Sequence, residues 1–396
     1  MINKNLKYLG FAFIFSLSFY VFYYTVFIET WQPYGNHEVS DLSAHVKQVL
    51  RSIEMNSFPA YSIWYRIVNI VSGFSISFKK VALTSMLLLA GLVAWKFLIN
   101  YAILESARSL KKNKILVFLI SIALIFVMPL LTYYTLEDYP NRYVANNFHV
   151  YLGNIAPNQW HNSTLLLAMP FSIIWFFYSI KYYKANHLRP FFIMSILASA
   201  TILCKPNFAM AFLPVLCSLV FLTNLKNSDY KQLILKLLIL GLPSTLLLTY
   251  QWYFTFVEGG SYLAHPTGTI IAPFLVWRLY SPHLITSALV SIAFPLAIAI
   301  FYFKKMDKFL QMAWFTFLVA LAMFITLAEY PSYAAADYEW ASIAANYILF
   351  LFSARLLLEQ PFDWKSKISY AIFLVHFLSG CFLLVSFFLK QTSLRI

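Results

Sequence analysis

Charged residues are scarce in this chain: they make up 11% of the 396 residues, against 61% that are hydrophobic, and the mean hydropathy is +0.70. This balance excludes a soluble globular domain of such length. Glycine is also rare, with ten residues, and no glycine-rich phosphate loop of the P-loop or Rossmann kind is present. The three cysteines show no CxxC spacing, so neither a zinc site nor a disulfide framework is indicated. We therefore expect a polytopic membrane protein without a cytosolic nucleotide site.

Long apolar runs predict an all-α membrane protein with about eleven transmembrane helices. The runs fall at 8–28, 81–104, 115–134, 164–182, 191–204, 207–225, 233–255, 284–303, 310–328, 343–358 and 368–389. The stretch 190–225 is too long for one crossing, so we divide it at Lys205-Pro206. A single kinked helix there would invert the topology of everything that follows.

The distribution of charge supports this division. With it, basic and acidic residues balance on the outward side, and the whole formal charge of +14 falls on the cytoplasmic side. Anionic lipid headgroups account for the basic character, and no nucleic-acid partner is expected. The longest connections, at about 29–80, 136–163, 255–284 and 328–342, all lie outward. We interpret residues 1–396 as one domain of a bacterial inner (cytoplasmic) membrane, with its active site facing outward.

The first outward loop carries acidic residues close to the membrane. Glu38 and Asp41 follow the first span, and His45 lies one helical turn beyond Asp41. Acidic groups at the mouth of a bundle are costly unless they meet water, a metal or a substrate. The apolar spacing predicts an amphipathic helix from Leu42 to Ile53 and a second interfacial element over 61–78. The alternative for Asp41 is a helix N-cap, and both roles are compatible.

The second outward loop is dense in hydrogen-bonding and aromatic groups. Trp160, beside Asn158 and Asn162, offers a stacking face and amide partners for a sugar, and His161 lies in the same run. The alternative is an aromatic belt that faces lipid headgroups.

Three outward cations are candidates for binding a lipid phosphate: Arg142, Lys205 and Arg278. The alternatives for Lys205 and Arg278 are snorkelling to the interface and pairing with Glu329 or Glu339. Glu339 is counted among the substrate-binding candidates for that reason.

Taken together, these features resemble the GT-C superfamily, integral membrane glycosyltransferases that take a sugar from a polyprenyl-phosphate carrier. Glu38 and Asp41 occupy the place of the acidic motif in the first outward loop of that superfamily. The segments Trp160-His161-Asn162 and Lys205-Pro206-Asn207-Phe208 look like those of bacterial members. This chain separates its two acidic residues by two positions, and it lacks a WWD triplet and a large soluble carboxy-terminal domain. The resemblance therefore implies a single-sugar transferase of cell-envelope polysaccharide biosynthesis, not an oligosaccharyltransferase.

The implied reaction moves a sugar from a polyprenyl-phosphate-linked donor to a lipid-linked or cell-surface glycan acceptor. A carboxylate, for which we select Asp41, would deprotonate the acceptor hydroxyl and give inversion. No cofactor is required, although Glu38, Asp41 and His45 could hold Mg²⁺ or Mn²⁺. Two other classes stay open: an O-antigen-type polymerase or ligase, for which only Arg278 lies in a late loop, and a lipid-linked glycan flippase or transporter, for which we would expect an internal repeat.

Overall fold

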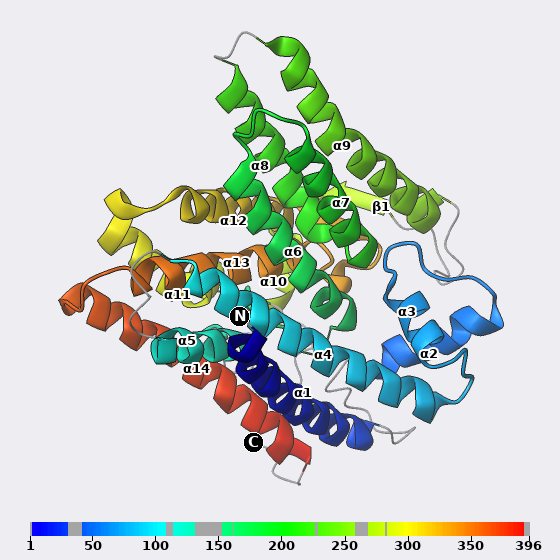
Figure 1. Cartoon of the computed structure of the whole chain (residues 1–396). Coiled ribbons are helices and arrows are strands. Elements are labelled where there is room, and N and C mark those ends of the chain that lie inside the picture. The colour runs from blue at the N-terminus through cyan, green and yellow to red at the C-terminus, as the bar shows by residue number, and fades with distance from the viewer. Residues whose placement is uncertain are drawn as a thin grey trace.

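Helices packed side by side make up most of the part of the chain that the structure describes (Figure 1). The computed structural model describes residues 2–30, 42–107, 114–130, 153–160, 162–225, 229–257, 268–281 and 283–391. The main helices are α1 (Ile2–Thr30), α4 (Phe78–Glu105), α5 (Lys114–Phe126), α6 (Ser163–Tyr182), α7 (Arg189–Cys204), α8 (Asn207–Asn224), α9 (Tyr230–Trp252), α11 (Leu284–Tyr302), α12 (Lys308–Thr326), α13 (Glu339–Leu358) and α14 (Trp364–Gln391).

Eight of these helices are long and apolar enough to cross a membrane. They are α4, α6, α8, α9, α11, α12, α13 and α14, with α9 extended by a π-helical turn (Tyr253–Val257) and α11 by a 3₁₀ turn (Phe303–Lys305). Shorter apolar helical segments lie at Gly10–Tyr24 within α1, in α5 and in α7. The chain is thus a predominantly helical, multi-pass membrane protein, and the number of eleven crossings stays a prediction.

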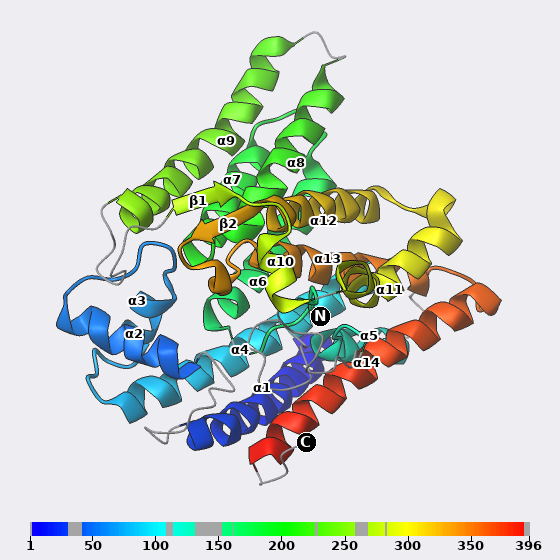
Figure 2. The ribbon, with the colours of Figure 1, turned by 180° about the vertical axis from the view of Figure 1, so that it is seen from behind.

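Helix α13 forms the centre of the bundle. Its most apolar 18-residue window is 94% buried, because α13 packs against α12, α11, α8, α4, α5 and α6. A helix that is apolar on all sides belongs in such a position. In Figures 1 and 2, α13 runs through the middle of the molecule, with α12 on one side and α4 on the other. Helix α9 contrasts with it, since only 22% of the equivalent window is buried.

Two short helices lie together at one end of the bundle, beside the start of α4 (Figure 1). They are α2 (Leu42–Glu54) and α3 (Trp64–Val71). Leu42, Val46 and Val49 of α2 are buried, whereas Ala44 and Lys47 are exposed. The predicted amphipathic helix is confirmed, and α3 falls inside the second predicted element.

A two-stranded antiparallel sheet is the main departure from the all-α prediction. β1 (Gly268–Ile271) pairs with β2 (Leu327–Tyr330), so that Thr269 faces Glu329 and Ile271 faces Leu327. β1 leads into α10 (Leu275–Tyr280), and β2 is followed by a 3₁₀ turn (Tyr333–Ala335). The β-branched run Thr269-Ile270-Ile271 suits a strand, but its partner lies more than fifty residues away and gives no local signal.

The predicted span 115–134 is wrong at its carboxy-terminal end, because α5 stops at Phe126. Pro129 disfavours helical geometry at the residue before it. The backbone beyond α5 pairs with other helices instead: Met128 N donates to His376 O at 3.0 Å, and Leu130 N donates to Val290 O at 3.0 Å. The apolar sequence therefore continues beyond Phe126, although the helix ends at that residue.

Candidate functional site

A cavity of about 750 Å³ opens at the end of the bundle that carries α2, α3 and the sheet. Six parts of the chain enclose it: α2 with the segment leading into α3, the start of α6, the turn between α7 and α8, the end of α9, β1, and the segment from β2 to α13. Its lining comprises Ala44, His45, Gln48, Pro59, Ala60, Tyr61, Tyr65, Asn162, Thr164, Lys205, Pro206, Asn207, Met210, Leu248, Thr249, Gln251, Trp252, Phe254, Thr255, Phe256, Thr269, Glu329, Ala335, Asp337, Tyr338 and Trp340.

The wall formed by α2 and α3 presents a chain of hydrogen-bonding groups. His45 Nδ1 lies 3.0 Å from the hydroxyl of Tyr65, which lies 2.7 Å from the hydroxyl of Tyr61. The amphipathic spacing of α2 places His45 and Gln48 on this wall while Val46 and Val49 are buried. Two polar residues of the predicted amphipathic helix, His45 and Gln48, therefore line a cavity.

Lys205 occupies the turn between α7 and α8. Pro206 disfavours helical geometry at Lys205, which is extended (φ −165°, ψ 121°), and α8 begins at Asn207. The predicted division of the 190–225 stretch into two helices is confirmed. The last carbonyls of α7 are bonded by neighbouring segments: Ser62 Oγ donates to Cys204 O, and Gln251 Nε2 donates to Ile202 O.

Lys205 is a buried residue, with only 8% of its surface exposed, and it forms part of the cavity wall. Its Nζ donates to Thr164 Oγ1 at 3.0 Å and lies 4.5 Å from the centre of the Trp340 ring. Asn162 is close by, since its Oδ1 caps α6 by accepting from Leu165 N and also contacts Thr164 Oγ1. The structure thus brings together two predicted substrate-binding residues, Asn162 and Lys205, with the predicted catalytic residue His45 in the same cavity.

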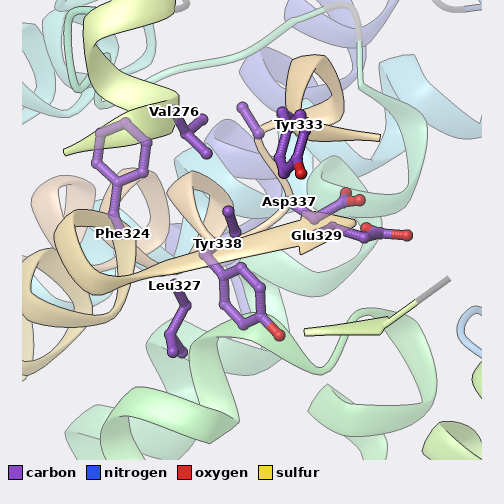
Figure 3. A pocket seen from close by; sticks show the side chains of 9 residues that line it. Val276, Phe324, Leu327, Glu329, Tyr333, Asp337 and Tyr338 are labelled. Atoms are coloured by element: carbon purple, nitrogen blue, oxygen red, sulfur yellow. The ribbon is translucent and has the colours of Figure 1, made fainter. Parts of the chain in front are cut away.

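Two carboxyl groups line the cavity from the segment that runs from β2 to the start of α13. Glu329 lies in β2 and Asp337 in the turn before α13, and their side chains extend in the same direction (Figure 3). Burial, a hydrogen bond to Asp337 and its negative charge raise the pKa of Glu329 to about 9. Asn207 Nδ2 donates to the backbone carbonyl of Asp337 at 2.7 Å, which ties this turn to the start of α8.

Sequence reasoning did not select the Glu329–Asp337 pair. Both residues lie in the predicted outward loop 328–342, and Glu329 entered the prediction only as a partner for a cation. The signal that could have found them is the presence of several acidic residues in one short outward loop, since carboxylates at the membrane surface need water or a partner.

Two amides in the cavity wall have polar atoms without a hydrogen-bond partner among the described residues. Gln251 is 3% exposed; its amide nitrogen donates to Ala60 O and Ile202 O, whereas its Oε1 is buried and unpaired. Gln48 Nε2 is likewise buried and unpaired. Both glutamines belong to the cavity wall.

The predicted sugar platform at Trp160 and Asn158 is not formed, because both residues are buried away from the cavity. Trp160 Nε1 donates to Ile125 O, and Asn158 Nδ2 donates to Leu124 O and Val127 O. These are the free carbonyls at the end of α5, which need partners inside an apolar bundle. The dense polar loop thus caps a helix that ends in the interior.

Asn158 also accepts a hydrogen bond from a buried lysine. Lys96 of α4 is 3% exposed, and its Nζ donates to Asn158 Oδ1 at 2.7 Å. The same Nζ lies 3.4 Å from the centre of the Tyr347 ring. An amide oxygen and an aromatic face together hold this ammonium group in the bundle.

Two further predicted substrate-binding residues lie outside the cavity wall. Arg278 of α10 is exposed, with its guanidinium 5.9 Å from the centre of the Phe274 ring. Glu339 is 1% exposed at the start of α13, and neither carboxyl oxygen has a hydrogen-bond partner within the described residues.

The remaining predicted site residues, Glu38, Asp41, Arg142 and His161, lie outside the described residues. Of the three predicted ligands for Mg²⁺ or Mn²⁺, the structure therefore describes His45 alone, and its Nδ1 is engaged by Tyr65. Within the described residues, no three His, Cys, Asp or Glu side chains converge as a metal site would require.

Searches against protein-family models, curated proteins and solved structures find no significant match to this chain.

Proposed function

We propose that this chain is a GT-C-like membrane glycosyltransferase that moves a sugar from a polyprenyl-phosphate carrier to a lipid-linked or cell-surface glycan acceptor. The observation that carries the proposal is the cavity of about 750 Å³ at one end of the bundle, which combines a buried cation, carboxyl groups and aromatic walls. This volume suits a sugar-sized ligand with part of its carrier.

The charges in the cavity match the needs of the reaction. The acceptor oxygen forms a bond to the anomeric carbon while the bond from that carbon to the phosphate oxygen breaks and its electron pair leaves with the phosphate. Lys205 supplies positive charge for the departing phosphate, because its ammonium group is held in the wall by Thr164 and Trp340. A carboxylate takes the proton of the acceptor hydroxyl, and the sequence predicts Asp41 for that role.

Aromatic and amide groups suit the recognition of a sugar. Tyr61, Trp252 and Tyr338 line the cavity and offer ring faces for the apolar side of a pyranose. The amide side chains of Gln48 and Gln251 also line the cavity, and amides can donate to and accept from sugar hydroxyls. These groups replace the platform that the sequence predicted at Trp160.

The test compares the lipid-linked and surface glycans of cells that lack the gene with those of cells that carry the wild type or a variant at matched protein levels. Mass spectrometry should show one sugar missing without the gene. Lys205→Met should lower that product about 100-fold, because it removes charge stabilisation of the leaving group. Lys184→Met, at an exposed position in the connection after α6, is the matched control and should behave as the wild type.

The rival classes give different results in the same experiment. A polymerase or ligase would change the length or the attachment of a glycan and leave its sugar composition intact. If no glycan changes in the absence of the gene, a transferase is contradicted and the transport interpretation is favoured.

A further inference from the structure

We propose that the Glu329–Asp337 pair accepts the proton of the acceptor hydroxyl during sugar transfer, a role that rests on the proposed function and competes with the prediction for Asp41. Figure 3 shows both side chains pointing the same way, Glu329 from β2 and Asp337 from the turn before α13. The same two residues line the large cavity.

Three contacts hold the pair in place. The β1–β2 register sets Glu329 opposite Thr269, whose hydroxyl is hydrogen-bonded to Tyr338 beside Asp337. Asn207 Nδ2 fixes the Asp337 carbonyl from the start of α8. Acid–base groups act efficiently when rigid elements fix them in this way.

The cavity around the pair is built for a hydroxyl-bearing ligand with an anionic group. Gln251, Thr249 and Thr255 line its wall with hydrogen-bonding side chains, and Lys205 adds a cation. Lys205 lies two residues before Asn207, so the cation and the carboxyl pair are tied to the same turn. A phosphate at Lys205 and a hydroxyl at the pair would therefore occupy one cavity.

The proton balance of the pair suits a base. The side chains of Glu329 and Asp337 lie beside each other at the cavity wall (Figure 3). Because two neighbouring carboxyl groups repel each other when both are ionised, the pair holds one proton between them. The remaining carboxylate takes the proton of the acceptor hydroxyl as its oxygen bonds to the anomeric carbon, and the pair later releases that proton to water. The described titratable groups around Glu329 are Asp337 and Tyr338, with Tyr333 in the adjoining pocket wall.

The first measurement separates the two candidate bases. Glycans are compared by mass spectrometry in cells that carry Glu329→Gln, Asp337→Asn, Asp41→Asn or Glu359→Gln at matched protein levels in the membrane. Glu359 follows α13 at the other end of the bundle and is the control. We expect Glu329→Gln and Asp337→Asn to lower the product at least about 100-fold and Asp41→Asn to retain it. If Asp41→Asn abolishes the glycan product while Glu329→Gln and Asp337→Asn retain it, the assignment to the pair is overturned.

The second measurement does not depend on the substrate. Infrared spectra of the purified full chain in lipid nanodiscs report the C=O stretch of protonated carboxyl groups as the pH rises. With the pKa of Glu329 raised to about 9, its band should persist through neutral pH and vanish in alkali. The wild type minus Glu329→Gln difference should contain that band, and the wild type minus Glu359→Gln difference should lack it.

Identical difference spectra for the two variants would show that Glu329 holds no proton at neutral pH and would contradict the pair. If the gene deletion changes no glycan while the infrared band is present, the transferase function fails and the proton-holding pair stands. The two failures are therefore distinguishable.

Discussion

At the scale of single residues, polar side chains inside this bundle mostly form hydrogen bonds with backbone carbonyl groups. Asn158 uses its whole amide: Nδ2 bonds Leu124 O and Val127 O, and Oδ1 accepts from Lys96. The sequence showed the hydrogen-bonding capacity of this loop but not its direction. A sugar and a helix end require the same donors and acceptors, so composition alone does not separate the two roles.

Asn158→Ala should therefore lower stability without abolishing transfer. It leaves two buried carbonyls and the Lys96 ammonium group without their partner, and each buried polar group left in this state costs about 1–3 kcal/mol. Thermal unfolding of the purified protein in detergent would show the loss, with Asn186→Ala at an exposed position as the control. An unchanged unfolding temperature together with lost glycan product would restore the sugar-binding interpretation.

At the scale of elements, hydropathy located helices well and their irregular ends poorly. The predicted spans 81–104 and 164–182 correspond to α4 and α6 within three residues, and the division at Lys205-Pro206 separates α7 from α8. The end of α5, the β1–β2 sheet and the Glu329–Asp337 pair were missed. Each of these depends on contacts between segments far apart in the chain, which local patterns do not encode.

The contact between α14 and the end of α5 gives an element-scale prediction. A Cβ at Gly380 would lie 1.5 Å from Phe126 O, so the two backbones meet only because this position is glycine. Gly380→Ala should separate the helices and lower the free energy of unfolding by about 1–3 kcal/mol or more.

Gly91→Ala in α4 is the matched control for that substitution. A Cβ at Gly91 meets nothing within 4 Å, so alanine should be neutral or slightly stabilising there. Thermal unfolding of both variants in the same detergent measures the difference. Equal unfolding temperatures would contradict the close approach at Gly380.

At the scale of the whole molecule, the two ends of the bundle differ in chemistry. One end carries α2, α3, the sheet and the cavity (Figure 2). Among the described residues, basic side chains are more numerous at the turns and helix ends of the other: Lys114, Lys181, Lys184, Arg189, Lys231, Lys304, Lys305, Lys308, Arg355, Lys365 and Lys367, against Lys47, Arg51, Arg66, Lys79, Lys80, Lys205 and Arg278 at the cavity end. Because basic residues favour the cytoplasmic side, this arrangement predicts that the cavity faces outward, where a lipid-linked donor and a surface glycan would meet.

Single cysteines at the two ends test this orientation. Glu54→Cys, exposed at the end of α2, should react in intact cells with a maleimide that does not cross membranes. Lys184→Cys should react only after the membrane is permeabilised, because the same reagent must first reach the cytoplasm. The wild type measures background from its own three cysteines, of which Cys204 is buried. The reverse labelling pattern would place the cavity in the cytoplasm, where a polyprenyl-linked donor on the outer leaflet could not reach it.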